Sequence, residues 1–279
     1  RNSPFAPWNL YAPGRAIRPL SKIGDVVIHD AIENCPFEPD RGDFPGIARL
    51  TFCDHLQQWY LRVTDNKYPF FSNLDTVSST TCGPWHEMDA VGNHEVMIDT
   101  ANHFLTLHEF DVFSVSEILR AARERYIAHK SNVSNIFFYL FRNNGKLAGA
   151  SLSHSHWQLF SSNFIPSGFQ EMYEEYDQYK NWTNGGCLKC AQIKEVQERV
   201  GQKNSLVVSG NKHCMAFVPF APEYPYEVWI VPKSCAPCFA YDMDNPYFRN
   251  DVAEMLLEVL RRFATVVSMP SLIHFNLML

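Results

Sequence analysis

The residues most able to do chemistry lie in one short segment, Gly149 to Phe160, where two histidines and a glutamine occupy alternate positions. Residues i, i+2 and i+4 of a β-strand share a face, so we expect His154, His156 and Gln158 to point the same way. Alternating polar residues can also mark only the solvated face of a half-buried strand. Two imidazoles and a carboxamide after a Gly-Ala-Ser turn favour a site over that alternative.

The chemistry suited to this set is group transfer at phosphorus. An imidazole held by its neighbours is neutral near pH 7, attacks phosphorus well and forms a labile phosphoramidate. A carboxamide two residues away can donate a hydrogen bond to a phosphoryl oxygen without repelling its charge. The pattern therefore favours transfer over proton chemistry.

The elements that must position this segment follow from apolar periodicity, which is alternate in strands and three-to-four-residue in helices. Ser114 followed by Glu117 is the pattern of a capping box, so we expect a helix from there to about Lys130. The other predicted elements are an irregular arm over 1–45, strands over 59–64, 136–141 and 156–164, a polar loop over 72–93 followed by an apolar run over 96–98, a helix over 252–266 and a strand from Leu272.

The second half of the chain repeats the order of the first. Glu95-Val96-Met97-Ile98 recurs as Glu227-Val228-Trp229-Ile230, and a possible metal ligand follows eight residues after each Glu, namely His103 and Cys235. We therefore expect an α+β fold of two tandem repeats with a mainly antiparallel sheet and flanking helices, divided near 167–179. The expected domains are 1–166, with the His-Gln segment, and 167–279, which stops in mid-strand and is expected to be truncated.

Composition excludes several classes of protein. With 279 residues, 46% of them hydrophobic, the chain can bury a sizeable core and is not extensively disordered. No apolar run approaches the ~18 residues of a membrane span. A net charge of −6 argues against a broad nucleic-acid-binding face but leaves small anions possible. A chain of this length needs no disulfides and no secretory signal opens it, so we expect a reducing, cytoplasmic location.

Four segments of the chain together resemble a known family. The first is His154-x-His156-x-Gln158 after Phe141-x-Asn143-x-Gly145. The others are Ala12-Pro13-Gly14-Arg15-Ala16-Ile17-Arg18-Pro19, Arg62-Val63-Thr64-Asp65-Asn66-Lys67-Tyr68-Pro69 and Tyr224-Pro225-Tyr226-Glu227-Val228-Trp229-Ile230-Val231-Pro232-Lys233. They resemble the active-site segment, phosphate-binding arm, nucleotide-binding segment and second-repeat signature of the galactose-1-phosphate uridylyltransferase family, with its related ADP-glucose phosphorylases. The resemblance implies two tandem histidine-triad-like repeats.

The resemblance also implies a reaction. The family's enzymes are transferases of galactose metabolism, so we expect UMP to move from a nucleotide sugar to a hexose 1-phosphate through a covalent nucleotidyl-histidine intermediate. His156 matches the nucleophile, and Gln158 matches the residue that contacts the transferred phosphoryl group. The matched substrate-binding positions are Arg15, Arg18, Asn66, Asn143 and Ser151.

The assembly implied by the resemblance is a homodimer, because the family's active site forms at a subunit interface. The arm that carries Arg15 and Arg18 has no helical periodicity, so it needs a surface on which to lie. The expected partners are a nucleotide sugar and a sugar 1-phosphate, with neither nucleic acid nor membrane.

Zinc is the cofactor that the resemblance implies. His154 matches a zinc ligand, and Cys35, Glu38 and His103 would complete a tetrahedral set. Glu38 stands where the family has a second Cys, but a carboxylate is an acceptable zinc ligand. The alternative is that Cys35 is simply a small buried hydrophobe.

A second, structural-type site is predicted from three thiolates. Cys187-x-x-Cys190 has a spacing typical of zinc sites, and Cys235 occupies the position equivalent to His103. Cys238 is a rival third ligand. By the resemblance, the fourth ligand is a histidine beyond Leu279.

Three other functions compete with uridylyl transfer. A histidine-triad hydrolase carries a third histidine where Gln158 stands, and glutamine cannot act as an acid, so hydrolysis is disfavoured. Adenylyl transfer to phosphate, as in ADP-glucose phosphorylase, shares the same motifs and stays open. A non-catalytic, zinc-stapled binding module would not require His156, Gln158 and both arm arginines together. Ser155 departs from the proline that the family usually has between its two histidines.

Overall fold

The chain folds into two compact units that each contain helix and antiparallel sheet. In the computed structural model, the described residues are 7–17, 32–38, 46–72, 74, 76–132, 135–235, 242–266 and 274–279. One unit comprises Arg1–Glu109, Glu124–Pro166 and Met269–Leu279, and the other comprises Phe110–Arg123 and Ser167–Ser268. The predicted α+β class with mainly antiparallel sheet is confirmed. That the second unit is a repeat of the first stays a prediction.

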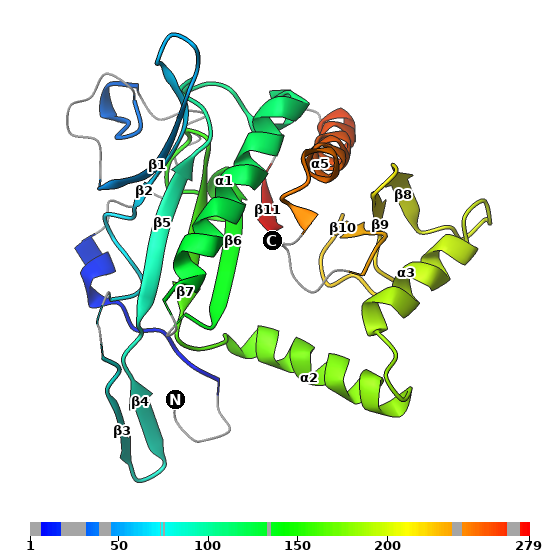
Figure 1. Cartoon of the computed structure of the whole chain (residues 1–279), viewed down its shortest axis with the longest axis horizontal. Helices are drawn as coiled ribbons and strands as arrows, with labels where there is room; N and C mark the ends of the chain where they lie inside the picture. The colour runs from blue at the N-terminus through cyan, green and yellow to red at the C-terminus, as the bar shows by residue number, and fades with distance from the viewer. Residues whose placement is uncertain are drawn as a thin grey trace. The chain divides into compact units, whose positions relative to one another are not determined.

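The first unit is built on a six-stranded sheet in which every neighbouring pair is antiparallel (Figure 1). The strands, in spatial order, are β1 (Ala48–Cys53), β2 (Trp59–Asp65), β5 (Gly92–Ile98), β7 (His156–Ser162), β6 (Phe137–Asn144) and β11 (Phe275–Met278). The strands predicted over 59–64, 136–141 and 156–164 are therefore present, and the apolar run over 96–98 lies in β5. Leu272, where a further strand was expected to begin, lies outside the described residues, and β11 begins at Phe275.

The strand that carries the predicted site lies inside this sheet, between β5 and β6. On one face of β7, Trp157 and Leu159 are fully buried, which places His156 and Gln158 on the other face. Across the ladder, His156 pairs with Ile98, and Gln158 pairs with both Val96 and Phe141. A strand held on both sides in this way keeps the site residues in a fixed register.

The first long helix, α1 (Val112–Lys130), begins two residues before the predicted capping box. The Ser114 backbone N–H donates to Asp111 Oδ1 at 2.7 Å, so the residue that caps the helix is Asp111. The prediction of a Ser114–Glu117 box is wrong, because Ser114 already lies in the first turn. Glu117 instead pairs with Arg120 on the same helix.

The polar loop predicted over 72–93 contains a β-hairpin. Strands β3 (Ser79–Cys82) and β4 (Trp85–Met88) pair in register and extend beyond the main sheet (Figure 1). Gly83, at the turn between them, has φ +58°, which glycine adopts without strain. Periodicity missed these strands because all four residues of β3 are exposed, so the sequence shows no buried face there.

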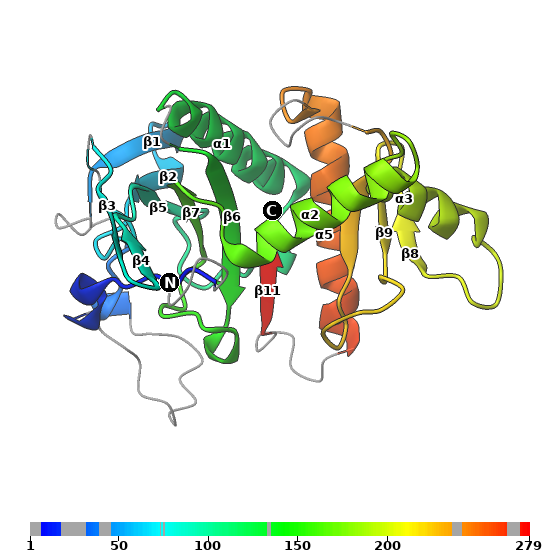
Figure 2. The same cartoon turned by 90° about the horizontal axis from the view of Figure 1, so that it is seen from below.

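The second unit combines helices with a small sheet. Its three strands, in spatial order, are β10 (Trp229–Pro232), β9 (Cys214–Phe217) and β8 (Val207–Gly210). The predicted helix over 252–266 is present as α5 (Pro246–Val266), which lies along this sheet (Figure 2). The segment over 167–179, expected to be a boundary, is occupied by helix α2 (Ser167–Trp182), and α3 (Leu188–Glu198) follows.

Short 3₁₀ helices complete the described structure. They are Pro13–Ile17 and Ile32–Asn34 in the predicted irregular arm, Leu107–Glu109 before α1, and Lys146–Ala148 between β6 and β7. Among the described helices, none is both long and apolar enough to cross a bilayer.

Candidate active site

His156 is the first residue of β7, and its ring is held in one tautomer. Its Nδ1 lies 2.8 Å from the backbone carbonyl oxygen of His154. A carbonyl oxygen can only accept, so Nδ1 carries the proton and donates it. In the neutral ring, the lone pair is then on Nε2, which is the atom available to attack an electrophile.

The surroundings of His156 keep it neutral. Burial lowers the pKa of His156 to about 4, the hydrogen bond to the His154 carbonyl opposes this shift, and the positive charge of Arg142 reinforces it. The imidazole is therefore unprotonated at pH 7. A neutral ring with a fixed Nε2 lone pair has the state that a nucleophile requires.

A buried ion pair lies beside β7. Arg142 Nη1 donates to Asp99 Oδ2 at 2.8 Å, and the indole N–H of Trp157 donates to the same oxygen at 2.8 Å. Arg142 also lies 3.5 Å from the carbonyl oxygen of His156. These contacts hold the start of β7, where His156 lies, against its neighbours.

Gln158 belongs to a polar cluster on the same face of β7 as His156. Gln158 Oε1 lies 3.2 Å from Nε2 of His94, and Nδ2 of Asn66 lies 3.1 Å from that same nitrogen. The Oδ1 atom of Asn66 accepts the backbone N–H of Tyr68 at 2.8 Å. The structure thus brings together the predicted residues Gln158 and Asn66, joined by His94, which the sequence did not single out.

Asn143 is held in place from β11. Asn276 Nδ2 donates to Oδ1 of Asn143 at 2.9 Å and to the carbonyl oxygen of Ala148 at 2.9 Å. Because the Asn143 oxygen is occupied, its amino group is the part available to a ligand. Ser151 is half-buried in the connection that leads into β7.

Arg15 lies against its own chain. Its Nη1 donates to the carbonyl oxygen of Tyr68, and its guanidinium carbon is 3.9 Å from the ring centre of Phe70. The surface that the arm requires is therefore supplied, for Arg15, by the segment after β2. Arg18 lies outside the described residues.

The predicted first metal site is brought together in space. Cys35, Glu38, His103 and His154 place one ligand atom each within 4.8 Å of the others. His154 Nδ1 lies 3.5 Å from Cys35 Sγ and 3.3 Å from Glu38 Oε1, and His103 Nδ1 lies 2.6 Å from that carboxylate oxygen. The other nitrogen of His154 donates to the Thr100 carbonyl at 2.8 Å, so Nδ1 offers its lone pair to the group.

This donor set fits zinc. One thiolate, two imidazoles and a carboxylate give four ligands of the types that zinc accepts in tetrahedral sites. Cys35 is 1% exposed and His154 is 1% exposed, so a metal here would be shielded from solvent. The Cys35 side chain has a polar contact as well as an apolar one, since its sulfur faces the Nδ1 lone pair of His154.

A second group of possible ligands lies in the other unit. The sulfurs of Cys187, Cys190 and Cys235 lie within 4.8 Å of one another. Cys187 precedes α3, and Cys190 is in its first turn, so the Cys-x-x-Cys spacing places both sulfurs on one side of the helix end. Cys238, the rival ligand, lies outside the described residues.

Three supporting residues were missed by sequence reasoning: His94, Asp99 and Arg142. His94 is 64 residues from its partner Gln158, and Asp99 is 43 residues from Arg142. Local spacing carries no signal for such contacts. The sequence hint for Arg142 was a charged residue directly after the apolar run Phe137–Phe141 of β6.

The fold and the site together define a class of protein. Residues 62–166 match the model of the N-terminal domain of galactose-1-phosphate uridyl transferase. An ADP-glucose phosphorylase from Arabidopsis thaliana is 30% identical over 230 residues, which is 81% of this chain and 63% of that protein. A galactose-1-phosphate uridylyltransferase from Thermotoga maritima is 28% identical over 215 residues, covering 75% of this chain and 63% of the relative.

Solved structures agree with these sequence matches. The crystal structure of an ADP-glucose phosphorylase from Arabidopsis thaliana with bound ADP-glucose has a TM-score of 0.74 at 25% identity, covering 95% of this chain and 76% of that one. These matches support the galactose-1-phosphate uridylyltransferase family, including the ADP-glucose phosphorylases, as the family of this chain. The chain spans less than two thirds of the length of these curated relatives.

Proposed function

We propose that the protein is a nucleotidyltransferase in which His156 takes a nucleoside monophosphate from a nucleotide sugar. The observation that carries the proposal is the state of His156, which is buried, neutral and polarised by the His154 carbonyl so that Nε2 bears the lone pair. In the first step, Nε2 attacks the α-phosphorus, a P–N bond forms, and the bond to the sugar phosphate breaks with the electron pair leaving on its oxygen. The acceptor phosphate reverses these changes in the second step.

The neighbouring residues suit this reaction. Gln158 lies on the same strand face as His156 and offers an amide donor to the phosphoryl oxygens. Asn143, in β6, offers a second amino group. Ser151 lies in the connection between β6 and β7. Arg15, with Arg18 three residues further along, is the proposed contact for the sugar phosphate, because guanidinium groups bind phosphate through two parallel hydrogen bonds. Asn66 is proposed to contact the nucleotide.

Zinc is proposed at both cysteine-containing groups. Cys35, Glu38, His103 and His154 would hold one ion, and Cys187, Cys190 and Cys235 would contribute to a second. Bound zinc would act as a structural clamp, and it would take no part in the transfer. Because His154 also supplies the carbonyl that orients His156, the first clamp would hold the nucleophile in position.

The proposal also concerns which nucleoside monophosphate is transferred. UMP transfer to a hexose 1-phosphate is the reaction implied by the resemblance to the uridylyltransferases. Adenylyl transfer to phosphate is the second candidate, because it shares the motifs and the relative of 30% identity is an ADP-glucose phosphorylase. We also propose a homodimer, as the family resemblance implies, and the cytoplasmic location stays a prediction.

The proposed reaction has a direct kinetic test. In a two-step mechanism, labelled glucose 1-phosphate exchanges into the nucleotide sugar without any second acceptor. We expect this exchange with UDP-glucose, with ADP-glucose or with both, and the preferred donor identifies the base. Absence of exchange with either donor, in protein that binds them, would contradict a covalent route.

A further inference from the structure

We propose that His94 is a positioning residue for nucleotidyl transfer, which holds the Gln158 carboxamide with its amino group toward the phosphoryl group. The reaction that it serves is the proposed function above, but the geometry is its own. His94 is in β5, beside β7, and its side chain is almost wholly buried. Its two ring nitrogens face different partners, and these decide where its proton lies.

The backbone of Phe70 fixes the tautomer of His94. The Phe70 N–H donates to His94 Nδ1 at 3.1 Å. A backbone N–H has no lone pair, so Nδ1 must be the unprotonated nitrogen, and in the neutral ring the proton is on Nε2. Asn66 Nδ2, at 3.1 Å from Nε2, cannot accept this proton because an amide nitrogen is a donor, so in this tautomer that contact is not a hydrogen bond. Gln158 Oε1, at 3.2 Å, can accept it.

This hydrogen bond decides which way the Gln158 amide faces. If the amide were reversed, Nε2–H would face the amino groups of both Asn66 and Gln158, and neither amide would offer it an acceptor. The oxygen therefore stays with His94, and the amino group turns away from it. A phosphoryl group then meets a donor. In the reversed orientation it would meet a carbonyl oxygen, which repels phosphoryl oxygens. His94 therefore selects the orientation of Gln158 that stabilises the transferred group.

The ring of His94 is held by stacking as well as by hydrogen bonds. It lies parallel to the Phe70 ring, with centroids 4.4 Å apart and planes 5° from parallel. The Arg15 guanidinium carbon lies 3.9 Å from the centre of Phe70, and it must occupy the other face because the imidazole covers the first. Arg15, Phe70 and His94 therefore form one stack, which connects the arm to the residue that orients Gln158.

The test is a double-mutant cycle measured on protein nucleotidylation. His94→Phe keeps an aromatic ring to stack on Phe70 but removes both ring nitrogens, while His94→Gln restores a donor near the position of Nε2. The readout is the single-turnover rate constant for labelling with the donor that the parent protein prefers. His108→Phe is a matched control, because His108 bonds to Thr106 away from Gln158.

We expect His94→Phe to slow labelling by about 10- to 100-fold, less than the roughly 10²- to 10³-fold that loss of a donor itself can cost. His94→Gln should recover part of this loss, and His108→Phe should be unaffected. In a Gln158→Ala background, His94→Phe should cost nothing further, because its effect passes through Gln158. Equal losses in both backgrounds would overturn the proposal, since a merely structural residue would give that result.

The tautomer can be tested without any activity. The ¹⁵N signals of the His94 ring in the purified parent protein, assigned by their loss in His94→Gln, should show a protonated Nε2 and an unprotonated Nδ1. The opposite tautomer would overturn the inference even if the variants fold poorly. If neither nucleotide sugar labels the parent protein, it is the proposed function that is contradicted. The two failures are therefore distinguishable.

Discussion

Backbone groups set the polarity of the side chains in this site. A backbone carbonyl or N–H can act in only one way, so each one fixes the ring or amide that it meets. The His154 carbonyl makes Nε2 the basic nitrogen of His156. The Ala148 carbonyl fixes Asn276 and, through it, the amide of Asn143. The site therefore has its donors and acceptors arranged before a ligand arrives.

The two histidines of the motif should respond differently to mutation. His156→Gly should reduce turnover by roughly 10⁴-fold or more, as expected for loss of a nucleophile, with the Tm unchanged. His154→Asn should lower both turnover and the Tm, because His154 joins Cys35 and Glu38. Steady-state kinetics and thermal melting measure both. A His154→Asn protein that melts with the parent would refute the structural role.

Sequence spacing predicted much of the site at residue scale. Alternate positions place His156 and Gln158 on one face of β7, and the scattered Cys, Glu and His residues do converge. Spacing could not predict which side-chain atoms donate and which accept, or which residues hold the site in place. The roles of His94 and Arg142 depend on strands that neighbour β7 only after folding, and on backbone groups that have no sequence signal.

At the scale of elements, the close approach of β5 to β7 depends on a glycine. A Cβ at Gly92 would lie 1.9 Å from the backbone oxygen of Ser161, so a side chain there would force the two strands apart. Gly92→Ala should lower the free energy of unfolding by roughly 1–3 kcal/mol, the usual cost of overpacking.

Its matched control is Gly168→Ala, in the first turn of α2, where an added Cβ has no neighbour within 4 Å. Denaturant unfolding of both variants provides the comparison. Equal stabilities would show that β5 and β7 are not tightly joined.

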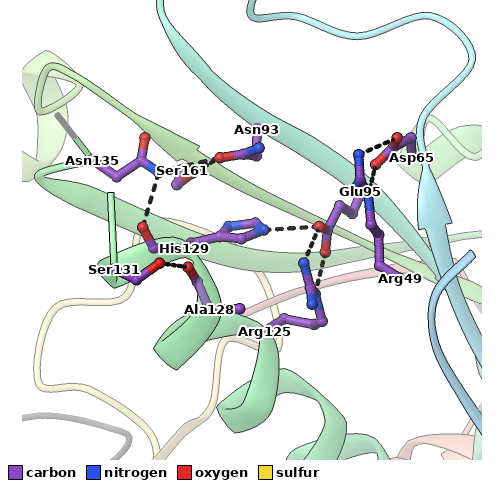
Figure 3. Close-up of polar contacts among 10 residues, drawn as sticks. All are labelled: Arg49, Asp65, Asn93, Glu95, Arg125, Ala128, His129, Ser131, Asn135 and Ser161. Carbon is purple, nitrogen blue, oxygen red and sulfur yellow. Dashed lines mark hydrogen bonds and ion pairs between the residues drawn. The ribbon is translucent and has the colours of Figure 1, made fainter. Parts of the chain in front are cut away.

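Arg125 and His129, in the C-terminal turns of α1, contact the buried Glu95 carboxylate of β5 (Figure 3). Arg125 donates to both Glu95 oxygens, at 2.9 and 2.6 Å, and His129 Nε2 donates to Oε1 at 2.9 Å. Burial raises the pKa of Glu95, but the hydrogen bonds and charges of His129 and Arg125 outweigh it, so the pKa is lowered overall.

This cluster predicts acid sensitivity. Because the folded pKa of Glu95 is below its unfolded value, its stabilisation is complete above the unfolded value of about 4.5 and is lost as pH falls through the folded value. Glu95→Gln should cost roughly 3–5 kcal/mol near pH 7, since it breaks the ion pair of the buried Glu95 carboxylate with Arg125, and should weaken the pH dependence in that acidic window.

Glu195→Gln is the control, because Glu195 is 58% exposed and its pair with Arg199 on α3 is solvated. Its cost should stay within about 0.5 kcal/mol. Urea titrations across pH 3–7 measure both variants. If the free energy of unfolding of Glu95→Gln falls with acidic pH as steeply as that of the parent protein, Glu95 is not the source of the acid sensitivity.

Burial of one face made some strands predictable but not all: no strand was predicted for β9, which is buried at all four residues but is too short to show a period. The strand over 59–64 alternates clearly and is present as β2. Strands β3 and β4 are largely exposed, so their sequence reads as a loop. Helix α1 was predicted, but its start was misplaced because two residues near it, Asp111 and Ser114, can both cap a helix.

At the scale of the whole molecule, each unit carries its own group of residues that could hold a metal ion. We expect zinc to co-purify with the protein and a chelator to lower the Tm, because metal that binds only the folded state stabilises it. Cys35→Ser should reproduce part of this loss. Cys53→Ser should not, because Cys53 is exposed and lies outside both ligand groups. Metal-free protein with the parent Tm would rule out a structural metal.

The central claim is that a nucleotide becomes bonded to Nε2 of His156. The most direct measurement is peptide mapping by mass spectrometry after brief incubation with UDP-glucose or ADP-glucose and an alkaline quench, which preserves a phosphoramidate. We predict a uridylyl or adenylyl mass on the peptide that contains His156, absent from His156→Gly. The same modification on another residue, or turnover with no modified peptide at all, would contradict this account.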